Sequence, residues 1–219
     1  VWQAGDLCEA GQFSRHGRKA RTDDKAVAWQ HELALAAHFW DEIHRAAPRA
    51  ACHWRLGNHE GRVERELLLL PYGEGIADLV SPETVVGASR PWLKIHPYNT
   101  RSNSKPLHVL PDLVAPHGAA CGVHATAAHL PLFAPFSVLH GHTHRVAHVV
   151  RVLADGSAQH SLSPGCLSQL QPAWAGERPT GWGHGLGMIY VRPDLTWSPH
   201  LVSIHRGRCL LPTGEDIRA

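Results

Sequence analysis

The sequence has few of the features that mark specialised classes of protein. No hydrophobic run reaches the roughly 18 residues of a membrane-spanning helix, so we expect no membrane partner. The five cysteines are widely spaced and form no C-x-x-C pair, which argues against a disulfide framework and against a thiolate zinc site. Walker A, H-E-x-x-H and G-x-S-x-G motifs are also absent, so nucleotide-driven motors, zincins and serine hydrolases are not indicated.

The sequence also lacks a large excess of positive or negative charge. The chain has 21 Lys and Arg against 19 Asp and Glu, a net charge of +2 that demands no polyanionic partner. Its single methionine, Met188, does not stand at the start, and the chain opens on the apolar Val1, so we expect a truncated piece of a longer protein. Unpaired, reduced cysteines indicate a cytoplasmic location.

What is present is typical of a globular protein: 219 residues, of which 43% are hydrophobic, predict a single domain over residues 1–219. Apolar residues from Trp29 to Ile43 recur at steps of four and three, which predicts a helix that begins near Thr22 and that Pro48 ends. Further helices are predicted at 62–70 and 119–130, and strands at 1–4, 50–56, 92–95, 107–115, 136–139, 186–191 and 201–205. Asp155-Gly156 between two alternating runs predicts a hairpin of 146–153 with 157–163. The order of elements favours an α/β fold.

Polar clusters rich in metal-type ligands follow several of these apolar runs. They are Gly5-Asp6, Gly57-Asn58-His59-Glu60, His117-Gly118 and Gly141-His142-Thr143-His144. Ligand sites of α/β proteins gather at the carboxyl ends of strands, so we expect one convergent site. Carboxylate, amide oxygen and imidazole together suit Mn, Fe, Zn or Ni. Two such ions about 3.5–4 Å apart can clamp a phosphoryl group and activate water.

In this order the clusters resemble the motifs of the calcineurin-like metallophosphoesterases, which are D-x-H, G-D-x-x-D, G-N-H-[ED], a lone His and G-H-x-H. The match at 57–60 is the most specific, because it needs one of only three asparagines at the right place. Finer features resemble a branch common in bacteria and their phages; they are Phe13-Ser14-Arg15-His16, Phe39-Trp40-Asp41, Arg62, Arg145 and Gly165-Cys166-Leu167. The D-x-H motif is absent and is expected upstream of Val1, and Glu9 stands where the second motif has Asp.

The resemblance implies a four-layer α/β/β/α sandwich with two mixed sheets. It also implies a hydrolase that cleaves phosphate mono- or diesters with two divalent ions, Mn foremost and otherwise Fe, Zn or Ni, and a metal-bridging hydroxide as nucleophile. Asp6 would bridge the ions, Asn58, His117 and His142 would bind the second ion, and His144 would bind the first. His59 would contact the phosphate and protonate the leaving oxygen, and Glu60 would hold His59 or its loop in place.

Several of these residues have alternative interpretations. Asp6 alone would be a turn residue, and His59 could be a loop histidine with structural partners. His124 and His129 compete with His117 for the role of the lone His, although Gly118 and the strand end favour His117. Arg15 and His16, from a basic loop, would either line a phosphate-facing rim or be solvated. Trp174 and Trp182 would either stack on a base or pack their loop.

Two other functions stay open at this point. One is a DNA or RNA nuclease of the same fold. The basic loop favours this function, whereas the small net charge argues against it. The other is a non-catalytic, metal-binding interaction module. The expected partner is a phosphate ester, either a nucleotide, a nucleic acid or a smaller compound, and the sequence indicates no oligomeric state. Without the D-x-H motif the first ion keeps only Asp6 and His144, so the truncated chain is expected to be inactive or weakly active.

Overall fold

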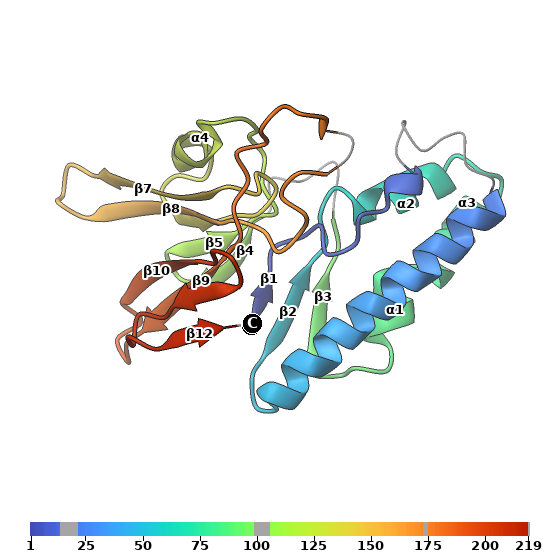
Figure 1. The fold of residues 1–219 in the computed structure, drawn as a ribbon, viewed down its shortest axis with the longest axis horizontal. Helices are drawn as coiled ribbons and strands as arrows, with labels where there is room; N and C mark the ends of the chain where they lie inside the picture. Colours follow the sequence, from blue (N-terminus) through green and yellow to red (C-terminus); the bar gives the residue numbers. More distant parts are fainter. Residues whose placement is uncertain (14–21, 99–105, 173–174, 219) are drawn as a thin grey trace. The chain divides into compact units, whose positions relative to one another are not determined.

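A computed structural model describes residues 1–13, 22–98, 106–172 and 175–218, which form a mixed α/β structure of helices and several sheets (Figure 1). The predicted substrate-binding residues Arg15 and His16 lie outside the described residues, as does Trp174. The chain divides into two units, Val1–Asn103 and Ser104–Ala219. The α/β class is therefore confirmed, whereas the single domain and the four-layer sandwich stay predictions.

The first unit is built on a parallel three-stranded sheet in the order β1-β2-β3. Its strands are β1 (Trp2–Gln3), β2 (Cys52–Arg55) and β3 (Leu93–His96), and its helices are η1 (Gly11–Phe13), α1 (Thr22–Ala46), α2 (Glu60–Leu67), α3 (Gly73–Leu79) and the π-helical turn η2 (Glu83–Gly87). Parallel neighbours require crossover connections, and helices supply them here. All three strands consequently end at the same edge of the sheet.

Helix α1 covers this sheet, as the apolar periodicity predicts (Figure 1). Trp29, Leu33 and Trp40 are at most 2% exposed and form one core with Trp54 of β2. Burial of each such side chain contributes about 1.5–3 kcal/mol, so this stripe fixes the helix on the sheet. The helix ends at Ala46, two residues before the proline that was expected to end it.

The second unit is built on a five-stranded sheet in the order β4-β5-β6-β8-β7. The elements of this unit are β4 (Leu107–Leu110), β5 (Leu113–Ala115), α4 (Ala125–Leu132), β6 (Ser137–Leu139), β7 (Val146–Val152), β8 (Ala158–Pro164), β9 (Gly185–Val191), β10 (Trp197–Ser203), β11 (Arg208–Leu210) and β12 (Asp216–Arg218). Strands β5, β6 and β8 are parallel, and antiparallel neighbours flank them on both sides. The β9–β10 and β11–β12 pairs are antiparallel two-stranded sheets.

Some boundaries differ from the sequence prediction. The hairpin around Asp155-Gly156 is confirmed, with Gly156 in the left-handed region and Ser157 N–H donating to Asp155 Oδ1 over 2.9 Å. The stretch 107–115 is two antiparallel strands rather than one, because Pro111 has no N–H for a ladder and the chain turns there. Helix α4 begins at Ala125 rather than at 119, and α3 and η2 were not predicted.

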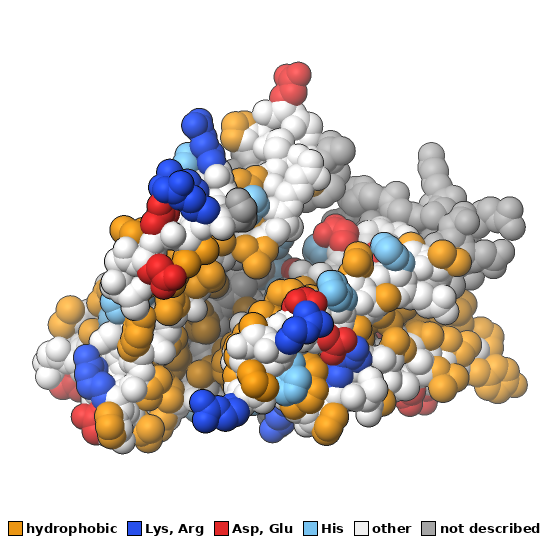
Figure 2. Space-filling model, turned by 60° about the horizontal axis from the view of Figure 1, so that its bottom comes forward, with side chains coloured by type: hydrophobic (Ala, Val, Ile, Leu, Met, Phe, Trp, Pro, Cys, Tyr) orange, Lys and Arg blue, Asp and Glu red, His pale blue; other side chains and the backbone are white. Residues whose placement is uncertain are grey.

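Charged side chains of both signs share the surface. On the face that Figure 2 shows, the described acidic and basic side chains are interspersed and hydrophobic side chains lie between them. The described side chains on that face form no continuous basic patch of the kind that long duplexes need. None of the helices in the described ranges combines the length and the apolar character that crossing a bilayer requires.

Candidate metal-binding and catalytic site

The predicted site residues follow the carboxyl ends of parallel strands in both units. In the first unit Asp6 follows β1, and Asn58, His59 and Glu60 follow β2, its parallel neighbour. In the second unit His117 follows β5, and the 141–144 loop follows β6 in the same way. Within each unit, therefore, loops far apart in sequence meet at one sheet edge.

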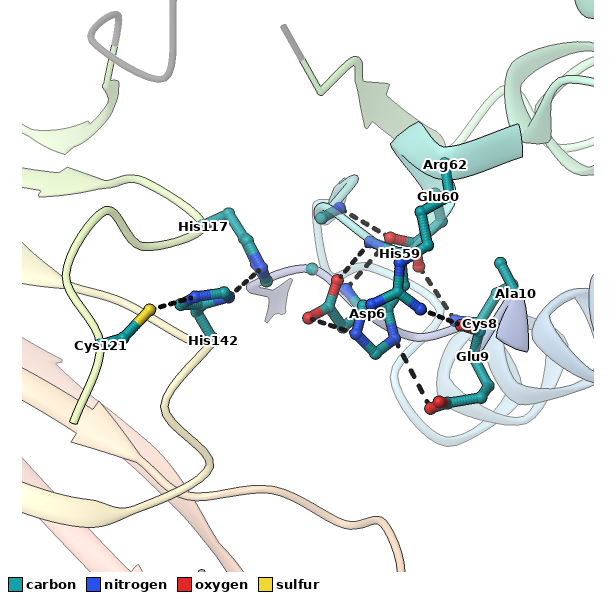
Figure 3. A network of polar contacts seen from close by, with 12 residues as sticks. Asp6, Cys8, Glu9, Ala10, His59, Glu60, Arg62, His117, Cys121 and His142 are labelled. Atoms are coloured by element: carbon teal, nitrogen blue, oxygen red, sulfur yellow. Dashed lines mark hydrogen bonds and ion pairs between the residues drawn. The ribbon is translucent and has the colours of Figure 1, made fainter. Parts of the chain in front are cut away.

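Asp6 has a backbone conformation that side chains seldom adopt. Its φ is 58°, and it follows Gly5 at φ 98°. Its side chain is only 6% exposed. Oδ1 accepts a hydrogen bond from His59 N–H over 2.9 Å, and Oδ2 lies 3.8 Å from His59 Nε2 (Figure 3). A left-handed non-glycine residue costs about 1–3 kcal/mol and persists where its surroundings over-determine it, which is typical of functional sites.

Glu60 joins the loop after β1 to the loop after β2. Its buried carboxylate accepts three backbone hydrogen bonds, to Oε2 from Gly57 N–H over 2.7 Å and Asp6 N–H over 3.1 Å, and to Oε1 from Cys8 N–H over 2.9 Å. Burial and the charge of Asp6 raise the pKa of Glu60, while the N–H donors oppose that rise. These three hydrogen bonds hold the backbone of both loops, which is consistent with the predicted positioning role of Glu60.

His59 lies between two carboxylates. Besides the contact with Asp6, its Nδ1 lies 3.5 Å from Glu9 Oε2, and its side chain is 16% exposed. The hydrogen bond to His59 is the main reason that the pKa of Glu9 lies below its ordinary value. An imidazole held by flanking carboxylates is placed to carry and release a proton. No functional role was predicted for Glu9, although its position as the last acid of the second motif was a usable signal.

In the second unit two predicted ligands face each other. His142 Nδ1 lies 3.2 Å from His117 Nε2, and His117 is completely buried (Figure 3). Gly141 N–H donates to the carbonyl of His117 over 2.8 Å, which fixes the two loops together. On its other side, His142 Nε2 lies 3.1 Å from the sulfur of the exposed Cys121. No sequence motif contains Cys121, so only the fold associates it with this site.

The backbone at Gly118 and His142 is adapted to the close approach of the two loops that carry His117 and His142. His142 has φ 65°, and Gly118 has φ 144°. A Cβ at Gly118 would lie 2.7 Å from Cβ of His142, a separation that real Cβ atoms do not show, so glycine is required where the two loops approach.

His144 lies at the end of the same loop, also left-handed at φ 57°. Its ring packs against Trp182 with centroids 4.2 Å apart, and its carbonyl accepts a hydrogen bond from Gly183 N–H over 2.9 Å. Trp182 therefore contacts the 141–144 loop, and both interpretations of Trp182 stay predictions.

The histidines that compete with His117 have other surroundings. His129 is completely buried, accepts a hydrogen bond from Ala119 N–H over 2.9 Å, and stacks on His140 with ring centroids 3.9 Å apart. Burial lowers the pKa of His140 to about 3, so both rings are structural and uncharged at neutral pH. His124 is exposed just before α4.

Each of the two units, taken by itself, carries donors of the types that suit a borderline divalent cation. Imidazole nitrogens of His117 and His142 in one unit, and the carboxylate of Asp6 in the other, are the ligand types that Mn, Fe, Zn and Ni share. No protein-family model matches the chain, and no curated protein or solved structure matches it either. The resemblance to the calcineurin-like enzymes therefore stays a prediction.

Proposed function

We propose that this chain is a metal-dependent phosphoesterase, hydrolysing phosphate mono- or diesters, and that it belongs to the calcineurin-like metallophosphoesterases with their four-layer sandwich. The observation that best supports this proposal is the pair His117 Nε2 and His142 Nδ1, 3.2 Å apart at the carboxyl ends of two parallel strands. Imidazoles in such a position are common ligands of divalent metals. We further propose Mn²⁺ as the main ion and a cytoplasmic location.

Asp6 and Asn58 of the first unit and His117 and His142 of the second would hold one ion together. Asp6 would also serve a second ion with His144. When bound, the two cations supply positive charge to the phosphoryl oxygens and activate a water molecule. Since this chain provides four ligands for one ion and two for the other, we expect one ion to be held much more tightly.

The remaining residues would handle the proton and the loop geometry. His59, between Asp6 and Glu9, would donate its proton to the leaving oxygen as general acid. Glu60 would keep Asp6 and His59 at fixed positions through its backbone hydrogen bonds. A general acid of this kind contributes about 10²–10⁴-fold to a rate.

Metal binding tests the ligand assignment. Isothermal titration with Mn²⁺ and elemental analysis should show one tightly bound ion in the parent chain. Asp6→Asn and His142→Gln should each abolish tight binding, because the proposed ion takes ligands from both units, whereas His38→Gln on the exposed face of α1 should leave it unchanged. Loss in only one of the two ligand variants would disprove the shared ion.

Turnover of bis-p-nitrophenyl phosphate in excess Mn²⁺ tests the reaction. The expected result is slow hydrolysis that falls by about 10²-fold or more in His59→Ala with metal content unchanged. Equal loss of metal in His59→Ala would show that His59 is a ligand instead. Metal binding without any turnover of mono- or diesters would favour a non-catalytic module, and cleavage of DNA or RNA alone would favour the nuclease.

A further inference from the structure

A second pair of histidines lies on the five-stranded sheet, apart from the motifs discussed so far. His148 is on β7 and His160 on β8, and the antiparallel register pairs His148 with Leu162 and Val150 with His160. Side chains two positions apart on a strand share a face, so both imidazoles project from the same side. His148 Nε2 lies 2.9 Å from His160 Nδ1, and His148 is exposed to solvent.

Neighbouring groups hold His160 in place. Its ring lies 5.2 Å from that of Trp197, whose indole N–H donates to Asp112 Oδ1 over 2.9 Å. Its backbone N–H donates to Ser137 Oγ over 3.0 Å, which ties β8 to β6 at this point. The carboxylate of Asp112 adds negative charge near the pair. The two rings are thus displayed on a rigid, paired strand rather than on a loop.

Two neutral imidazoles in this arrangement can both offer a lone pair to one ion. A neutral imidazole carries its hydrogen on one nitrogen and a lone pair on the other, so with the hydrogens on the outer nitrogens, His148 Nδ1 and His160 Nε2, both facing nitrogens are free to bind a metal. Burial lowers the pKa of both rings, so both are uncharged at neutral pH, the form that binds metals. Imidazole nitrogen binds a metal such as zinc at about 2.0–2.1 Å, so nitrogens 2.9 Å apart are close enough to share one ion.

We propose that His148 and His160 form a separate binding site for a borderline divalent cation, Cu²⁺ foremost, through Nε2 of His148 and Nδ1 of His160. Water would complete the coordination, and Asp112 would contribute attraction through its charge. Nitrogen donors bind Cu²⁺ more tightly than Ni²⁺, Zn²⁺ or Mn²⁺, so the site should discriminate against Mn²⁺. This proposal does not depend on the proposed phosphoesterase activity.

Copper titration of the whole chain tests the site, because an ion that is lost in His148→Gln or in His160→Gln is assigned to this pair whether or not copper also binds at the candidate metal centre. Electron paramagnetic resonance of the parent protein should show a Cu²⁺ population with two nitrogen ligands. His148→Gln and His160→Gln should each remove that population and lower the titrated stoichiometry by one ion. Loss of an outer-shell partner alone costs about 10–100-fold in metal affinity, so loss of a ligand should cost at least about tenfold.

His200→Gln is the matched control, because His200 is exposed on the neighbouring hairpin strand β10 and its ring contacts Tyr190. This control should keep both the stoichiometry and the spectrum. Circular dichroism and thermal melting identify any variant that fails to fold. Because His148→Gln and His160→Gln each remove one proposed ligand, the same loss of copper is expected in both. Unchanged copper stoichiometry in folded His148→Gln and folded His160→Gln would overturn the proposal, whether or not the chain hydrolyses phosphate esters.

Discussion

Replacement of Glu60 should destabilise the first unit far more than replacement of an exposed acid. Glu60 is 3% exposed, and its carboxylate accepts backbone hydrogen bonds from Asp6, Cys8 and Gly57. Glu60→Ala would leave these three N–H groups without their acceptor, whereas Glu60→Gln keeps the shape of the side chain and one carbonyl oxygen. Comparison of the two variants therefore distinguishes the loss of all three backbone hydrogen bonds from the loss of one.

The magnitudes follow from the number of bonds. A hydrogen bond to a charged group contributes about 1.5–3 kcal/mol, and a buried donor left unsatisfied costs about 1–3 kcal/mol. Since loops relax and water reaches part of the gap, we expect Glu60→Ala to lower the free energy of unfolding by about 3–5 kcal/mol rather than by the full sum. In Glu60→Gln the amide group meets the N–H of Cys8 as a second donor, so a loss of about 1.5–3 kcal/mol is expected.

Urea unfolding at pH 7.5, followed by tryptophan fluorescence, measures these losses, since Trp29, Trp40 and Trp54 lie in the core of the same unit. Glu74→Gln, an exposed acid of α3, is the control and should change stability by no more than about 0.5 kcal/mol. If both Glu60 variants matched this control, the three backbone hydrogen bonds would not hold the loops as argued. Equal losses in both would place the energy in the charge rather than in the number of bonds.

Three further perturbations probe the second unit and the sheet of the first. Cys121→Ala should weaken Mn²⁺ binding by about 10-fold in calorimetric titration, because the sulfur beside His142 Nε2 orients that ring. Gly118→Ala should lower the free energy of unfolding by about 1–3 kcal/mol and weaken Mn²⁺ binding, because its Cβ would collide with His142. Burial lowers the pKa of His96 to about 4, so the free energy of unfolding measured with urea should fall as pH drops from 6.5 toward 4, by at most about 3 kcal/mol.

Each of these expectations has a clear contrary result. Unchanged Mn²⁺ affinity in Cys121→Ala would mean that other contacts orient His142. A Gly118→Ala chain as stable as the parent would mean that the loops can separate without cost. Between pH 4 and 6.5 the His96 side chain binds a proton in the unfolded chain but not in the folded chain. The free energy of unfolding must therefore rise with pH in this window. A His96→Gln variant with the same pH slope as the parent would assign the slope to other groups.

Local patterns were enough to predict much of the scaffold. The steps of four and three from Trp29 to Ile43 predicted α1, because one apolar stripe must be buried. The Asp155-Gly156 turn predicted the β7–β8 hairpin, because Gly156 supplies the left-handed backbone that the turn needs. The stretch 71–91 was not predicted well, since its Pro, Gly and Ser residues give no regular period and α3 and η2 depend on their neighbours.

The amino-acid sequence by itself determined the kinds of ligand in this protein and their position after strands. Tertiary structure alone decided which side chains meet. Cys121 and His142 are 21 positions apart, and Glu60 and Cys8 are 52 apart, so no local pattern could pair them. The physical reason is that periodicity and turn chemistry act over a few residues, whereas these contacts arise only when parallel strands place the ends of distant segments side by side.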